Sequence, residues 1–212
     1  QMAAVTLGKQ VRKRFLKALK RHQKKKPQRS IFVIDYKGDM RARQTDSLRE
    51  EITAILQIAR KGDEVVVNLE SPGGSVSGYG LAAAQLDRLR VAGIPLTVCV
   101  DKVAASGGYM MASVADRIVA APFAIIGSIG VLMQLPNFYR WLEQHGIAFE
   151  QITAGEYKRT LTAFGKNTAA DRKKVQDELN TMHQQFKGHI KERRPDIKLS
   201  KVATGEFWLA QE

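Results

Sequence analysis

Three glycine-containing turns follow predicted strands and carry small hydroxyl side chains. They are Ser71-Pro72-Gly73-Gly74-Ser75, Ala104-Ala105-Ser106-Gly107-Gly108 and Gly127-Ser128-Ile129-Gly130. Taken singly, each is typical of a tight turn, where glycine serves because it has no Cβ. Ser106 differs because it lies where a strand passes into a helix, with two glycines behind it that let the backbone turn sharply and expose Oγ. This pattern is that of a nucleophile elbow, and it predicts Ser106 as a nucleophile.

A nucleophilic serine needs a base, and this sequence offers histidine or lysine. None of the four histidines has an obvious aspartate to support it, which disfavours a triad: His22, His145, His183 and His189. A lysine base must have its pKa lowered by roughly three units, through desolvation or a neighbouring like charge. Lys158 follows a predicted strand and a small-residue turn, which favours partial burial. Its neighbours Glu156 and Arg159 are equally typical of a solvated turn, so the residues alone leave both readings open.

Composition points to a folded domain with a basic N-terminal arm. Of 212 residues, 44% are hydrophobic and 26% charged, which predicts a packed core. The formal net charge is +13, but eleven of the 34 Lys and Arg residues lie within positions 1–30, which contain no acid, so the rest has 23 bases against 21 acids. A single cysteine, Cys99, excludes an internal disulfide, and one cysteine with four scattered histidines disfavours a zinc cluster. We expect no metal and no cofactor.

The basic arm, residues 1–29, has two open interpretations. It is either a solvated stalk beside a membrane or an element that binds anionic lipid headgroups, at about 1 kcal/mol per nearby basic residue. Nucleic acid is disfavoured as a partner, because Phe15 is the only aromatic side chain in the arm. The stretch 118–139 is long enough to span a membrane, but its prolines and glycines suit strands and turns better than one helix.

Beyond the arm, strands and helices alternate. Single helices between strands imply right-handed β-α-β crossovers and a mainly parallel sheet, with functional loops at the carboxyl ends of its strands. Ser47-x-x-Glu50 resembles a capping box that begins the first helix, and a long helix runs from Thr168 to Pro195. The other predicted elements are strands at 31–36, 65–69, 95–100, 117–120, 125–133 and 149–153, and helices at 76–91 and 138–145.

Four motifs in order resemble the signal peptide peptidase A family of bacterial serine peptidases, particularly its SohB branch. They are Ser71-Pro72-Gly73-Gly74-Ser75-Val76, Lys102-Val103-Ala104-Ala105-Ser106-Gly107-Gly108-Tyr109, Ile126-Gly127-Ser128-Ile129-Gly130-Val131 and Ala154-Gly155-Glu156-Tyr157-Lys158-Arg159-Thr160. The resemblance extends from about residue 31 to the end. It implies an α/β fold shared with the Clp protease and crotonase superfamily, with residues 30–212 forming a serine peptidase catalytic domain that is truncated at its C-terminal end.

The resemblance also implies a role for each site residue. Ser106 matches the nucleophile and Lys158 the general base of a Ser/Lys dyad, while Ser128 matches a serine that orients the lysine. Gly73 and Gly107 match backbone donors to an oxyanion hole, each worth about 2.7–4 kcal/mol in the transition state. The implied reaction is endopeptidase cleavage of membrane-associated or extended, signal-peptide-like substrates through an acyl-enzyme.

Location and assembly follow from the same resemblance. It implies a bacterial inner-membrane protein, anchored by a segment upstream of Gln1, with a periplasmic catalytic domain. The basic arm points instead to the cytoplasmic side by the positive-inside rule. In the family, a neighbouring catalytic unit can supply the lysine, so we expect a homo-oligomer. Two alternatives stay open: a non-catalytic membrane-associated binding module of the same fold, and a crotonase-like acyl-CoA enzyme, which would leave Lys158 without a role.

Overall fold

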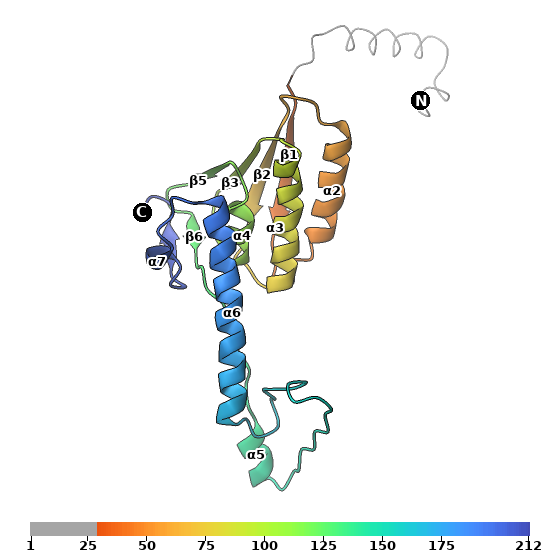
Figure 1. Cartoon of the computed structure of the whole chain (residues 1–212), viewed down its shortest axis with the longest axis vertical. Coiled ribbons are helices and arrows are strands. Elements are labelled where there is room, and N and C mark those ends of the chain that lie inside the picture. The colour runs from red at the N-terminus through yellow and green to blue at the C-terminus, as the bar shows by residue number, and fades with distance from the viewer. Residues whose placement is uncertain (1–28) are drawn as a thin grey trace, which may run out of the picture.

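Four parallel strands form the main sheet of the protein (Figure 1). The computed structural model describes residues 29–212, so the predictions for the basic arm fall outside the described residues, apart from Arg29. The sheet order is β1-β2-β3-β5, and every neighbouring pair is parallel. The strands are β1 (Ile31–Lys37), β2 (Glu64–Glu70), β3 (Leu96–Val100) and β5 (Arg117–Ala120).

Two helices connect successive strands of this sheet. Helix α2 (Thr45–Ile58) joins β1 to β2, and helix α3 (Val76–Val91) joins β2 to β3. Their apolar faces pack on alternate residues of the strands, and the largest hydrophobic core lies between them and the sheet. The predicted α/β fold, with β-α-β units and a mainly parallel sheet, is therefore confirmed.

A second, three-stranded sheet follows the main one. It has the order β4-β6-β7, with β4 parallel to β6 and β6 antiparallel to β7. Its elements and the short helix that follows β4 are β4 (Val103–Ala105), α4 (Gly107–Ala112), β6 (Ile125–Gly127) and β7 (Phe207–Leu209). Ser71, at the end of β2, pairs with Ala104 of β4 and thereby joins the two sheets.

Helix α6 (Ala169–Arg193) is the longest helix of the described chain. Its second half packs on α4 and β6 through Phe186 and Ile190, which form a second core with Tyr109, Ile129 and Ala203. Helix α7 (Leu199–Val202) follows it. The first half of α6 projects away from the two sheets, as Figure 1 shows.

The projecting end of α6 carries a distal segment, residues 131–168, which contains helix α5 (Tyr139–Gln144). Phe164 packs on Phe138 and Phe149, with ring centroids 6.0 and 5.7 Å apart. The side chain of Asn137 donates to the carbonyls of Thr162 and Gly165. The predicted strand at 149–153 is wrong, because this stretch lies away from both sheets and pairs with no strand of the described chain.

Helix α2 begins at Thr45, two residues before the predicted capping box. Its N-cap is Gln44, whose side chain makes no capping hydrogen bond. Instead, Gln44 Oε1 accepts from the N–H of Lys37, and Nε2 donates to the carbonyl of Asp35. The contact with β1 fixes the start of the helix, so the local Ser-x-x-Glu pattern was misleading here.

Within residues 29–212, no helix has both the length and the apolar character needed to cross a membrane.

The predicted start of the long helix at Thr168 is confirmed, and the structure adds a complete capping box there. Thr168 Oγ1 accepts from the N–H of Asp171, whose carboxylate accepts from the N–H of Thr168. We expect Thr168→Ala to cost about 1 kcal/mol locally, so amides in the first two turns of α6 should exchange about fivefold faster. Hydrogen exchange followed by mass spectrometry measures this directly.

Thr181→Ala is the control for this experiment, because Thr181 lies inside the same helix and its hydroxyl bonds only to the helix carbonyl of Asp177. Alanine favours a helix interior, so exchange should not quicken. Equal acceleration by both variants would show that the capping box does not hold this end of α6.

Candidate functional site

The pairing of β4 with β6 brings two serines side by side. Ala105 is the register partner of Gly127, so Ser106 and Ser128 both follow directly from paired residues. The N–H of Ser106 donates to the carbonyl of Gly127 at 2.8 Å. Both serines have a positive φ, 51° at Ser106 and 50° at Ser128, which non-glycine residues rarely adopt. The two residues therefore form a pair of strained corners at the carboxyl ends of neighbouring strands.

Ser106 also lies at the start of α4. It is the N-cap of that helix, its side chain makes no capping hydrogen bond, and the next residue, Gly107, is buried in the first turn. The strand-turn-helix geometry that the glycine pattern predicted is present. This geometry leaves Ser106 Oγ free to face the two cavities that Ser106 lines.

The Pro-Gly-Gly turn lies directly against this corner. A Cβ added at Gly73, where φ is +88°, would be 2.7 Å from the backbone nitrogen of Gly107 and 2.7 Å from Cβ of Ser106. The structure thus brings Gly73 and Gly107 together beside Ser106. The N–H of Gly73 donates to Ser71 Oγ at 3.1 Å, whereas those of Gly74 and Gly107 have no acceptor within residues 29–212.

A buried hydroxyl network holds the turn in place. Tyr79 Oη donates to the carbonyl of Asp39 at 2.9 Å, so the 2.6 Å contact between Ser71 and Tyr79 places the Ser71 hydroxyl as the donor. Ser71 Oγ in turn accepts from Gly73. Burial raises the pKa of Tyr79, which keeps its phenol protonated. The Tyr79 ring also packs on Gly107, where any Cβ would collide with it.

Ser128 lines the same cavity as Ser106. This cavity has a volume of about 580 Å³ and is also lined by Gly73, Gly74 and His183. Ser128 Oγ donates to the carbonyl of Gly205 at 3.3 Å, and its N–H donates to the carbonyl of Glu206. The predicted lysine-orienting serine is therefore close to the predicted nucleophile, although its hydroxyl contacts the main chain.

Lys158 is the predicted residue that the structure does not bring to this site. It lies in the distal segment, which Figure 1 shows beside and below the projecting half of α6, away from the two sheets. Its side chain is exposed, it lines neither cavity that contains Ser106, and Nζ has no partner within the described chain. The adjacent Tyr157 is held to the start of α6 by Lys174, whose Nζ lies 4.9 Å from the ring centroid. Within one copy, Ser106 is thus without the predicted lysine.

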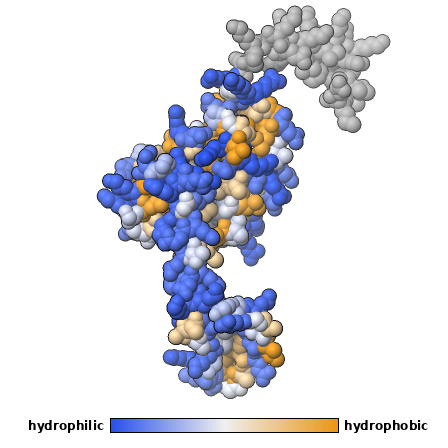
Figure 2. All heavy atoms as spheres, viewed as in Figure 1, coloured by the Kyte–Doolittle hydropathy of each residue, from blue (hydrophilic) through white to orange (hydrophobic). Residues whose placement is uncertain are grey.

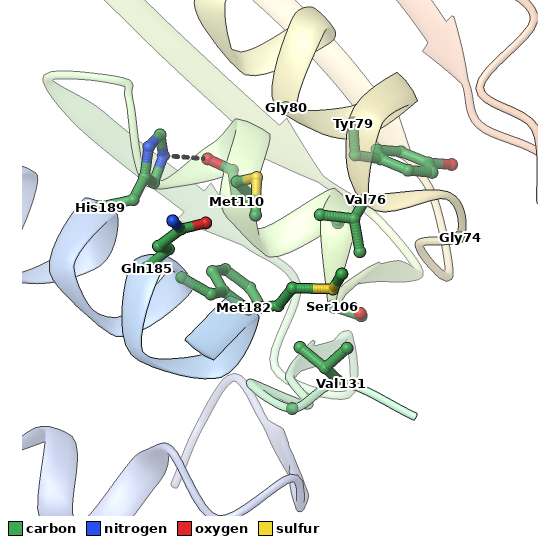
Figure 3. Close-up of a pocket in the computed structure, with 13 residues that line it drawn as sticks. Gly74, Val76, Tyr79, Gly80, Ser106, Met110, Val131, Met182, Gln185 and His189 are labelled. Atoms are coloured by element: carbon green, nitrogen blue, oxygen red, sulfur yellow. Dashed lines mark hydrogen bonds between the residues drawn. The ribbon is translucent and has the colours of Figure 1, made fainter. Parts of the chain in front are cut away.

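A smaller pocket of about 180 Å³ opens beside Ser106 between helices α3, α4 and α6 (Figure 3). Its apolar walls include Val76, Met110, Met182 and Phe186, and its lining also includes Gly80, Gln185 and His189.

Two histidines lie closer to Ser106 than the sequence indicated. His189 lines the small pocket and contacts the carbonyl of Met110 through Nε2 at 3.1 Å, while His183 contacts the carbonyl of Ile129 at 3.0 Å. Because a carbonyl only accepts, Nε2 carries the proton in both rings. Burial, together with the charge of Arg193, lowers the pKa of His189, which keeps it neutral at pH 7.

Sequence reasoning missed the proximity of both histidines and of Tyr79 to the site, and it gave no role to Ser71, although Ser71 begins the first glycine-containing turn. The two histidines and Tyr79 reach the site only through the packing of α6 and α3, which no local motif marks.

No group of three or more His, Cys, Asp or Glu side chains that could hold a metal ion is found within residues 29–212.

The Tyr79 hydroxyl supports the site, so its loss has a measurable cost. Tyr79→Phe would leave the Asp39 carbonyl and the Ser71 hydroxyl each without a buried partner, which should lower the free energy of unfolding by about 1–3 kcal/mol. Urea denaturation measures this change. In Tyr139→Phe, the lost hydrogen bond to Glu143 is exposed, and the change should stay within about 0.5 kcal/mol. Similar losses in both variants would argue against the network.

Comparisons with known proteins identify the family of this chain. The family model described as peptidase family S49 matches residues 88–212, and that of its N-terminal part matches residues 1–86. The probable protease SohB of Buchnera aphidicola subsp. Acyrthosiphon pisum is 60% identical over 184 residues, which cover 87% of this chain and 55% of that protein. The probable protease SohB of Haemophilus influenzae is 54% identical over 182 residues, covering 86% of this chain and 52% of that protein.

A more distant relative is protease 4 of Haemophilus influenzae, 27% identical over 190 residues that cover 86% of this chain and 31% of that protein. The chain therefore spans about half the length of the two SohB relatives. The four motifs, the strand-turn-helix corner at Ser106 and the family models agree, and the chain belongs to peptidase family S49.

Proposed function

We propose that this chain forms the catalytic part of a serine endopeptidase in which Ser106 is the nucleophile and Lys158 of a neighbouring copy is the base. The observation that carries the proposal is the strained corner at Ser106, with its free hydroxyl and the amides of Gly107 and the Pro-Gly-Gly turn beside it. Membership of peptidase family S49 supports the same reaction class.

The proposed reaction has two stages. Ser106 Oγ attacks the peptide carbonyl as its proton passes to the neutral amine of Lys158, and Lys158 then returns the proton to the departing amine. A water molecule hydrolyses the acyl-enzyme in the same manner. The developing oxyanion accepts from the N–H of Gly107 and from the Pro-Gly-Gly turn, where Gly74 has the free N–H and Gly73 must first release Ser71.

The position of Lys158 suits a lysine that acts on Ser106 of a second copy. The distal segment carries it away from its own Ser106, and within one copy its side chain is exposed. A protein interface would supply the desolvation that a lysine base requires. Ser128 lines the cavity of Ser106 and can turn its hydroxyl from Gly205 towards an incoming lysine.

The distal segment also exposes the apolar surface that such an interface needs. Figure 2 shows apolar side chains gathered at this end of the molecule. The exposed fractions are 76% for Leu132, 55% for Trp141, 50% for Ile147 and 96% for Ile152. Clustered exposed apolar side chains are typical of interaction sites, and a second copy is the proposed partner. The proposed substrates are extended or membrane-associated peptides, and the proposed location is the inner membrane.

The first test separates an enzyme from a binding module. An active-site fluorophosphonate probe should label the chain at Ser106, and Ser106→Ala should abolish both labelling and peptide hydrolysis. Folding should be retained, because the substitution removes only a hydroxyl. Ser77→Ala is the matched control for labelling and should be labelled like the parent, since it removes an exposed hydroxyl that lines neither cavity containing Ser106. Labelling that survives Ser106→Ala, or hydrolysis at the parent rate, would overturn the nucleophile assignment.

The second test asks which copy supplies the lysine. Ser106→Ala and Lys158→Ala chains are inactive separately, but co-assembled they should recover about a quarter of the parent activity in a head-to-tail assembly, because half the serines and half the lysines are intact. A Lys158→Arg chain should be as inactive as the Lys158→Ala chain, since guanidinium cannot accept the proton. No recovery on co-assembly would place the base in the same copy.

Histidine variants complete the second test. His183→Gln and His189→Gln keep a donor near the carbonyls of Ile129 and Met110, and both should retain activity. If either variant loses activity as completely as Lys158→Ala does, a histidine is the base.

A further inference from the structure

Helix α3 forms one wall of the small pocket beside Ser106, and Gly80 contributes no side chain to that wall. Helix α3 contributes Val76, Tyr79 and Gly80, residues that share one face of the helix at three- and four-residue spacing. In Figure 3, Gly80 lies on α3 above Met110, across from the side chains of α6. The wall at Gly80 is therefore backbone only.

Packing does not explain this glycine. A Cβ added at Gly80 would meet no atom within 4 Å, whereas one at Gly78 would lie 2.9 Å from Cβ of Ala42. Gly78 thus permits close contact with the segment before α2. Glycine inside a helix is less stable than alanine, so Gly80 lowers the stability of α3 without relieving any contact. What its missing side chain leaves is space in the pocket.

The chemistry of the pocket indicates what fills that space. Val76, Met110, Met182 and Phe186 present apolar surface, and the neutral ring of His189 adds no charge. An apolar cavity of about 150 Å³ accommodates benzene, so a pocket of about 180 Å³ has room for a side chain as large as leucine or phenylalanine.

We propose that Gly80 is a specificity-determining residue: it keeps the pocket deep enough to accept a large apolar side chain from the peptide residue whose carbonyl Ser106 attacks. The inference rests on the proposed peptidase function and names the substrate class of the same site. A side chain at position 80 would project beside Val76, one helical turn away, and shorten the pocket.

The test is a set of fluorogenic peptides that differ only in the residue before the scissile bond, which is Ala, Leu or Phe. The full chain should prefer Leu and Phe. In Gly80→Ala, the ratio of kcat/KM for Phe to that for Ala should fall about tenfold or more, as a single methyl group in an apolar pocket can change discrimination by that factor. An unchanged ratio would overturn the inference while leaving the peptidase function standing.

Gly188→Ala is the matched control. Gly188 lies inside α6, a Cβ there also meets nothing within 4 Å, and it lines neither cavity that contains Ser106. Both Gly→Ala variants should raise Tm, by about 1–4 °C, but only Gly80→Ala should change the substrate ratio. A change of the ratio in both variants would mean that helix stability, and not pocket depth, is responsible.

A binding measurement makes the test independent of turnover. In the Ser106→Ala chain, an N-acetyl tripeptide acid ending in Phe should shift the NMR signals of the Met110 and Met182 methyl groups, and adding Gly80→Leu should abolish that shift. Shifts without hydrolysis by the parent chain would support the role of Gly80 and argue against the peptidase. Equal shifts in the Ser106→Ala chain with and without the Gly80→Leu substitution would overturn the role of Gly80.

Discussion

The hydrogen bond from the N–H of Ser106 to the carbonyl of Gly127 fixes the geometry on which the candidate site depends. It extends the pairing of β4 with β6 by one step, just where both strands leave the sheet. A non-glycine residue with positive φ costs of order 1–3 kcal/mol and persists only where its surroundings determine it. Here the surroundings are β6 on one side and Gly73 on the other, where even a methyl group would not fit.

Helix α3 packs against this corner, and three of its consecutive residues have separate roles. Gly78 brings the helix close to Ala42, and the Tyr79 ring covers the first amide of α4 while its hydroxyl secures the Pro-Gly-Gly turn through Ser71. Gly80 leaves room for a substrate. Three consecutive residues of a single helix thus combine backbone packing, a buried hydrogen-bond network and an open pocket, so changes at neighbouring positions have different consequences.

Local patterns predicted those parts of the protein that local interactions determine. The corner at Ser106 follows from a strand that runs into two glycines, and α6 begins at Thr168 as its apolar periodicity predicted. Prediction failed where distant contacts decide. Gln44 binds β1 and moves the start of α2, and residues 149–153 pair with no strand among residues 29–212. His183, His189 and Tyr79 have no motif, because only the packing of α3 and α6 brings them to the site.

The length of helix α6 fixes the distance between the hydrophobic core and the distal segment. With a rise of about 1.5 Å per residue, the 22 residues from the cap at Thr168 to the core contact at Ile190 span roughly 33 Å. One residue inserted ahead of Phe186 would rotate the distal segment by about 100° around the helix axis. An insertion of seven residues, close to two turns, would nearly keep its direction and would move Lys158 about 10 Å further out. The length of α6 therefore matters to the proposed reaction as much as the side chains at its two ends do, because it sets the position of Lys158.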